Sequence, residues 1–89
     1  MFQPKLALTV ETAKAVLEAG LLAIQGGQTE IDLAELTTVD SAGVATLLAW
    51  QRTAHARKQS LHFLNLPTGL RSLAELYGVA ELLYSPSLH

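Results

Sequence analysis

The sequence contains no cysteine, and this absence excludes several kinds of site. There is no disulfide framework, no thiolate nucleophile and no cysteine-based zinc site. Charged residues are also scarce, at 16% of the 89 residues, against roughly 25% in an average domain. A small domain with so little charge either has an unusually neutral surface or has part of its surface covered by a partner.

An excess of positive charge and long apolar runs are missing too. Six Lys and Arg stand against eight Asp and Glu, for a net charge of −2, so the basic surface of a nucleic-acid binder is not expected. The apolar runs are far shorter than the ~18–20 residues that span a bilayer. Residues 1–5 also lack the charged and apolar regions of a signal peptide. We therefore expect a cytoplasmic protein without nucleic-acid partners.

The patterns that are present alternate between strand and helix. Alternating apolar residues predict strands over residues 6–10, 29–36 and 60–66, and helix-forming stretches follow at 10–24, 42–58 and from Pro67 to Gly78. Residues 79–84 fit a last turn or a short strand. Such an alternation with short connections is typical of a mostly parallel sheet. We predict a single α/β domain over residues 1–89, with a small, mostly parallel sheet and helices packed mainly on one side.

Short signals predict where these elements begin and end. Thr9 is the expected N-cap of the first helix, and Gly26-Gly27 its stop. Thr37-Thr38 is expected to form a loop, and Asp40 to cap the helix that follows.

Patterns of catalytic or ligand-binding residues are incomplete. Ser41 and Gly43 form half of a G-x-S-x-G nucleophile elbow, but Val39 occupies the position of the first glycine. The histidines at 55, 62 and 89 have no spacing that suggests a base for Ser41 or a metal-ligand set. No glycine-rich phosphate loop follows a strand. We therefore predict no catalytic residues, no cofactor and no metal.

Ser41 lies where a strand leads into a helix. A hydroxyl at such a position is ordinarily a cap or a first-turn residue. The same position also suits a phosphate, because free backbone N–H groups and the helix dipole favour negative charge, although the neighbouring Asp40 would oppose it. Ser41 is therefore a candidate phospho-acceptor or control point.

The helix over residues 42–58 has two different faces at roughly 100° per residue. Val44, Leu47, Leu48 and Ala54 are expected to face the sheet. The opposite side is small and neutral where a surface helix usually carries Glu, Lys and Gln, with Arg52 at its edge; it holds Ala42, Ala45, Thr46, Ala49, Thr53 and Ala56. Alanine is also the best helix former, which is the alternative explanation. Together with the low charge, this face is a candidate docking surface.

Residues 31–43 resemble the central motif of STAS domains, the fold of anti-sigma-factor antagonists. In that motif an apolar strand containing Asp is followed by a short loop and by Asp-Ser-Ser/Ala-Gly opening a Leu- and Ala-rich helix. The resemblance continues through residues 52–57, 60–67 and 70–79. STAS domains usually begin with two strands before the first helix, whereas one is expected here. An uncovered sheet edge can pair with a neighbour, so self-association stays open.

Within the STAS family, the C-terminal run Leu76-Tyr77-Gly78-Val79 is most similar to a branch of cytoplasmic subunits of a bacterial ABC transporter for phospholipids. The resemblance implies a non-enzymatic accessory subunit that binds and supports the ATPase subunit and reaches the inner membrane only through that complex. The alternative is an anti-sigma-factor antagonist whose Ser41 is phosphorylated by an anti-sigma factor kinase. The residues expected to contact the partner are Thr38, Asp40, Ser41, Ala42, Ala45, Ala49 and Arg52.

Overall fold

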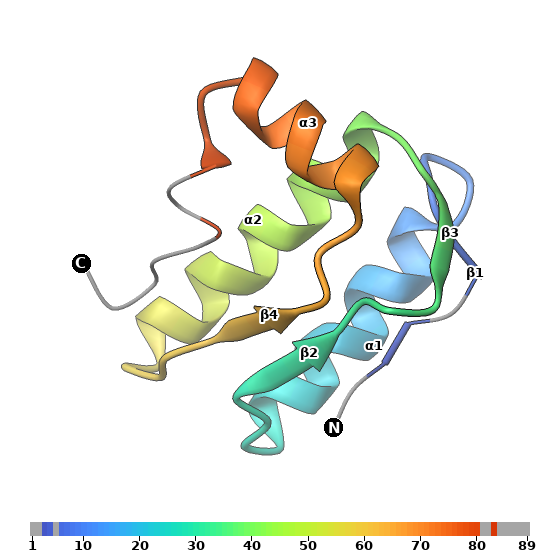
Figure 1. The fold of residues 1–89 in the computed structure, drawn as a ribbon. Helices are drawn as coiled ribbons and strands as arrows, with labels where there is room; N and C mark the ends of the chain where they lie inside the picture. The colour runs from blue at the N-terminus through green and yellow to red at the C-terminus, as the bar shows by residue number, and fades with distance from the viewer. Residues whose placement is uncertain (1–2, 5, 81–82, 84–89) are drawn as a thin grey trace.

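Strands and helices alternate along the chain, apart from two consecutive strands before the longest helix (Figure 1). The computed structural model describes residues 3–4, 6–80 and 83. Its elements are β1 (Leu6–Leu8), α1 (Ala13–Gln25), β2 (Glu30–Asp32), β3 (Leu36–Val39), α2 (Ser41–Ala56), β4 (His62–Leu64) and α3 (Thr68–Leu76).

The strands associate in two parallel pairs. β1 pairs with β3, and β2 pairs with β4 in the register Glu30↔His62 to Asp32↔Leu64. In Figure 1, α1 and α2 lie together behind β2 and β4, and α3 lies above them. The predicted α/β fold, with parallel strands and with helices on one side, is confirmed.

The segment expected to be one strand over residues 29–36 is broken in the middle, and the prediction of a Thr37-Thr38 loop is wrong. Asp32 Oδ1 accepts a hydrogen bond from Ala34 N at 2.9 Å, and Leu36 N donates to Leu33 O at 3.1 Å. These bonds turn the chain after β2. Residues 37 and 38 then belong to β3, whose partner is β1 rather than β4.

The first helix begins later than expected, with Thr12 rather than Thr9 at its N-cap position. Thr9 O accepts from Thr12 N and Ala13 N, and Thr12 Oγ1 accepts from Thr9 N while donating to Ala7 O. Residues 9–12 therefore close a turn of their own, which leaves Val10 75% exposed. The expected stop at Gly26-Gly27 is confirmed, because α1 ends at Gln25 and Gly27 has φ +99°.

The core lies between the helices and the strands, with Trp50 of α2 as its largest fully buried side chain. The Trp50 indole donates from Nε1 to Leu17 O at 3.0 Å. Gly20 of α1 faces the same ring, and a Cβ there would overlap it. α1 and α2 pack closely because one supplies a glycine and the other a tryptophan. Other fully buried side chains are Leu8, Ile24, Ile31, Leu33, Leu47, Leu61 and Leu70.

The start of α2 also requires a glycine. A Cβ at Gly43 would lie 2.8 Å from Leu70 Cδ2 and 3.2 Å from Leu8 O. The first turn of α2 can therefore approach both β1 and α3. At the end of α3, Gly78 has φ +72°, so the predicted glycine stop is confirmed. Of residues 79–84, for which a last turn or a short strand was expected, residues 81, 82 and 84 lie outside the described residues.

Candidate functional site

Asp40 fixes the start of α2 through two hydrogen bonds. Its backbone is extended, and its Oδ1 accepts from Ala42 N at 2.9 Å, so the predicted N-cap is confirmed. Its Oδ2 accepts from Val10 N at 3.0 Å. One carboxylate thus satisfies a free N–H of the helix and holds the 9–12 turn beside it.

Ser41 follows as the first residue of α2, and its side chain is exposed. Within the described part of the chain, its hydroxyl forms no hydrogen bond. The capping role belongs to Asp40, which leaves the Ser41 hydroxyl available to a partner or a modifying enzyme. Val10, tethered to Asp40, is a neighbouring exposed apolar residue that sequence reasoning missed. Only the tertiary hydrogen bond brings it there, so no local pattern could have indicated it.

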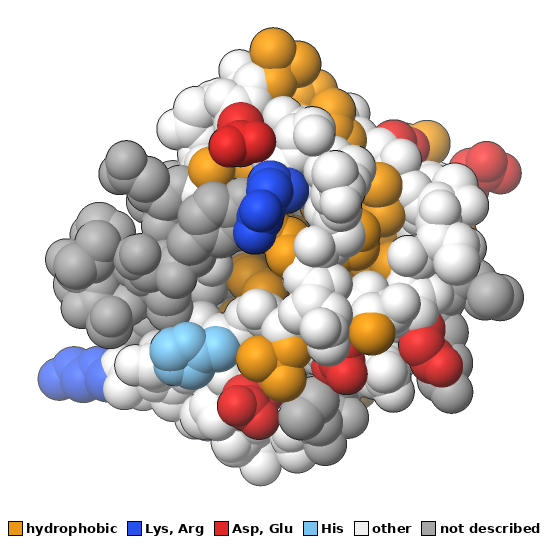
Figure 2. Space-filling model, in the orientation of Figure 1, with side chains coloured by type: hydrophobic (Ala, Val, Ile, Leu, Met, Phe, Trp, Pro, Cys, Tyr) orange, Lys and Arg blue, Asp and Glu red, His pale blue; other side chains and the backbone are white. Residues whose placement is uncertain are grey.

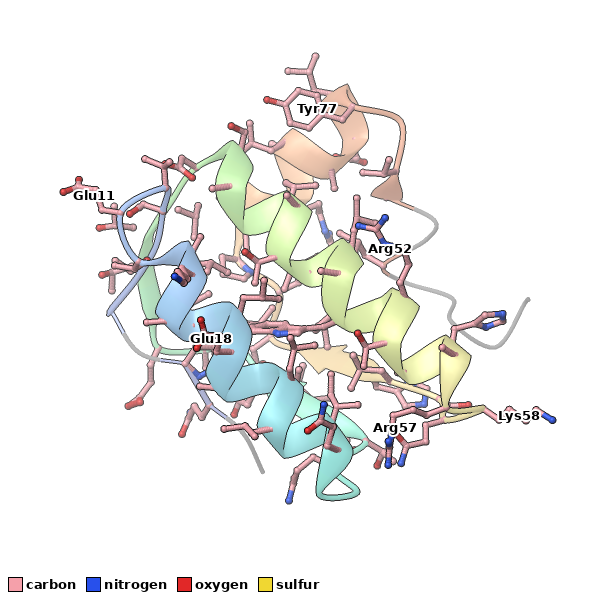
Figure 3. The ribbon with its side chains drawn as sticks, turned by 180° about the vertical axis from the view of Figure 1, so that it is seen from behind. Glu11, Glu18, Arg52, Arg57, Lys58 and Tyr77 are labelled. Carbon is pink, nitrogen blue, oxygen red and sulfur yellow. The ribbon has the colours of Figure 1, made fainter. Side chains whose placement is uncertain are left out.

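The outward face of α2 is a stripe of small side chains. Ala45 and Ala56 are exposed and Ala49 is half-buried, and the same face carries Ser41 at its start and Arg52 between Ala49 and Ala56. These positions follow one another at spacings of three or four residues, which places them on one side of a helix. We call Ser41, Ala45, Ala49, Arg52 and Ala56 the α2 stripe. In Figure 3, α2 runs between α1 and α3.

Two residues lie differently from the prediction for this helix. Thr46 is only 3% exposed, and its Oγ1 donates to Ala42 O at 2.8 Å. It is covered because it lies one turn before Trp50, on the side of α2 that packs against α1. Leu48, expected to face the sheet, is only half-buried. The next buried side chains of α2 are Trp50 and Gln51. Gln51 Nε2 donates a hydrogen bond to Leu61 O at 3.0 Å.

The remaining predicted contact residues lie on β3, just before α2, and in the first turn of α2. Thr38 is exposed on β3, two residues before the cap, and Ala42 is half-buried in the first turn of α2. The structure therefore gathers Asp40, Ser41 and Ala42 at one helix end. Ala45, Ala49 and Arg52 continue along the stripe, and Thr38 lies on the strand that leads to it.

Neither of the two described histidines lies beside Ser41 at the start of α2. His55 is exposed near the end of α2, and His62 is exposed at the start of β4. His89 lies outside the described residues. Across residues 3–4, 6–80 and 83, no three His, Asp or Glu side chains come together where they could hold a metal ion.

An open cleft lies on the strand side of the molecule (Figure 2). Side chains of β4, α3 and their connection line it, together with Leu83: His62, Phe63, Asn65, Leu66 and Arg71. No residue of the predicted partner-binding set lines this cleft.

Asp32 ties the ends of β2 and β4 together. Its Oδ1 accepts from Asn65 Nδ2 at 3.1 Å as well as from Ala34 N. The Asn65 hydrogen bond and the Ala34 N–H hold the pKa of the Asp32 carboxyl below its usual range. Gln3 Nε2 also donates to Oδ2, at 3.4 Å. The aspartate thus shapes the turn that sends the chain from β2 to β3.

These features define a small α/β domain with a capped, partly exposed helix on its surface. The protein family described as "Mlab, STAS domain" matches residues 7–84, and the chain belongs to this STAS family. STAS domains act through protein–protein interactions and are generally non-enzymatic. No curated protein and no solved structure matches the chain. Among the described helices, none has both the length and the apolar character needed to cross a membrane.

Proposed function

We propose that the protein is a non-enzymatic accessory subunit of a bacterial phospholipid-transport ABC system. In this proposal it binds and supports the ATPase subunit through the N-terminus and outer face of α2. The observation that carries the proposal is the α2 stripe, in which an unbonded Ser41 hydroxyl leads into exposed and half-exposed alanines. Membership of the MlaB-type STAS family supports the choice of partner.

The stripe suits a tight protein contact for physical reasons. Alanine side chains let another backbone approach closely, and they lose no rotamer freedom on burial. The N-terminal turn is held by Asp40 before any partner arrives, so little ordering is required of it. The partner would contact Thr38, Asp40, Ser41, Ala42, Ala45, Ala49 and Arg52.

The remaining parts of the proposal concern location and assembly. The chain acts as one STAS domain over residues 1–89, in the cytoplasm and at the inner membrane only through its partner complex. It needs no cofactor. The short parallel pairs leave strand edges, so self-association is tested in the same experiment by the stoichiometry of the complex.

The test is affinity purification of the chain from native membranes, followed by mass spectrometry of what accompanies it. The proposal expects an ATPase of an ABC transporter, with its permease, at a fixed ratio to the chain. Purification of the chain without any ATPase would contradict it.

The second candidate, an anti-sigma-factor antagonist, is favoured by one observation. Ser41 is exposed at a helix N-terminus, where the dipole would favour a phosphate while Asp40 would repel it. A partner kinase could therefore switch the interaction at the same surface. Intact-mass spectrometry of the protein from its own host separates the two functions. A phosphorylated Ser41 fraction that changes with stress supports the antagonist, and unmodified protein bound to an ATPase supports the transporter subunit.

A further inference from the structure

Charge is divided unevenly along this weakly acidic chain. Residues 41–74 contain no Asp or Glu, yet they hold four of the six Lys and Arg and two of the three histidines. Residues 1–40 hold six of the eight acidic residues and only two lysines. The low net charge therefore hides two regions of opposite sign.

Three of the six Lys and Arg lie at the C-terminal end of α2, together with one histidine. Arg52, His55, Arg57 and Lys58 are all exposed there, and we call these four residues the basic end. Figure 3 shows Arg57 and Lys58 beyond the last turn of α2, with Glu11 and Glu18 on the other side of the molecule. Arg57 Nη2 donates to Gln25 O at 3.3 Å. Across the described residues, none of the four forms an ion pair with a carboxylate.

A helix C-terminus attracts cations on its own, but this explains only part of the basic end. The dipole effect is confined to the last turn, whereas Arg52 precedes the end of α2 by a full turn. Like charges on neighbouring residues repel each other, and among the described residues no Asp or Glu stands between positions 41 and 74 to neutralise Arg52, Arg57 and Lys58. The arrangement fits a surface whose neutralising charges come from outside the chain.

We infer that the basic end binds an acidic segment of the same protein partner that covers the α2 stripe, and this inference rests on the proposed function. Arg52 belongs to both surfaces, so they form one continuous strip. From Ser41 to Arg52 the helix rises about 16 Å. The partner segment that matches this strip carries small or apolar residues where it contacts residues 41–49 of this chain. It carries Asp or Glu where it contacts residues 52–58.

A protein segment fits this surface better than an extended polyanion. A nucleic acid or an anionic membrane is bound through a large excess of positive charge, whereas this chain has a net charge of −2 and only a short stretch of exposed basic residues over positions 52–58. A short acidic segment reaches the basic end alone. It also gains a direction, because the reversed orientation places its carboxylates beside Asp40 and Glu11, where like charges repel.

The experiment measures the Kd of the full chain for the purified ATPase subunit by calorimetry, at about 50 and about 300 mM NaCl. The altered chain is the Arg57→Glu/Lys58→Glu double variant, which changes two exposed residues of the basic end that lie outside the α2 stripe. Lys14→Glu is the control for a charge reversal elsewhere, since Lys14 is exposed on α1, away from the basic end. Both charge changes lie at exposed positions, and thermal unfolding confirms that each variant is folded.

We expect the double variant to raise the Kd at least about tenfold at low salt, and the difference to shrink at high salt. Lys14→Glu should stay within about twofold of the unaltered chain. An unchanged Kd in the double variant, or an equal loss in Lys14→Glu, overturns the inference and leaves the proposed function standing. Failure of the unaltered chain to bind the ATPase overturns the proposed function, and this inference with it.

Discussion

Replacing Gly20 by Ala tests how α1 and α2 are held together, because two physical effects of opposite sign meet at this residue. Ala is favoured over Gly inside a helix by about 1 kcal/mol, so an exposed site would become more stable. Gly20, however, is buried against the Trp50 ring, and an added Cβ would overlap three ring atoms.

The size of the opposing effect follows from how the ring is held. Trp50 is fully buried, and its Nε1 donates to Leu17 O on the same helix as Gly20. Overpacking a tight core costs about 1–3 kcal/mol, and moving the ring away also weakens a hydrogen bond with a net value of about 1 kcal/mol. After the gain in helix propensity, Gly20→Ala should lower the free energy of unfolding by about 1–3 kcal/mol.

Urea unfolding followed by far-UV circular dichroism measures this change, and the fluorescence of Trp50, the single tryptophan, reports on the contact itself. Trp50→Phe supplies the companion variant, because the smaller ring leaves room for the methyl group. In that background the cost of Gly20→Ala should fall by about 1 kcal/mol or more. An increase in stability of about 1 kcal/mol on Gly20→Ala alone would refute the packing described for these helices.

Two further predictions concern the aspartates. Asp40→Ala should lower the free energy of unfolding by about 1–2 kcal/mol, because α2 loses its cap and Val10 N loses its acceptor. Asp40→Asn should lower the free energy of unfolding by a smaller amount. Equal losses of stability for the two variants in thermal melts would contradict the capping role. For Asp32, the pKa is lower in the folded state, so the ionised carboxylate stabilises the fold above its ordinary pKa and loses this effect as the pH falls through the folded value. Denaturant unfolding at several pH values below about 5 should therefore show a smaller acid-induced loss for Asp32→Asn than for the unaltered chain, and parallel curves would count against the Asp32–Asn65 hydrogen bond.

The α/β class, the parallel pairing and the position of α2 could be predicted because they depend on local patterns. Asp40 before a helix-forming run is a strong N-cap signal, and the structure places its carboxylate on Ala42 N. The division of residues 29–39 into β2 and β3 could not be predicted from a local pattern. It depends on the Asp32 side chain, which accepts a hydrogen bond from Asn65, the residue that follows β4 and lies 33 positions later in the chain.

The faces of α2 were predicted only in part. Helical periodicity placed Ala45, Ala49 and Arg52 outward, and the structure agrees. It placed Thr46 outward as well, because the prediction assumed that only the side of α2 facing the sheet is buried. In the structure α1 covers a second side of α2, and Thr46 lies on that side. Trp50 was overlooked because its burial depends on a glycine in another helix.

The most direct test of the central claim compares one substitution at two places. Ala45→Arg puts a long charged side chain into the α2 stripe, and Ala19→Arg puts the same side chain on an exposed position of α1. Both should change the free energy of unfolding by no more than about 0.5 kcal/mol, whereas Leu47→Ala, at a fully buried position, should cost about 2–5 kcal/mol.

The decisive quantity is the amount of ATPase that co-purifies with each folded variant from native membranes. The account predicts that Ala45→Arg abolishes co-purification, because the arginine would be desolvated without a partner charge, and that Ala19→Arg retains it fully. Retention of the ATPase at its native ratio by Ala45→Arg would contradict the assignment of the α2 stripe as the docking surface.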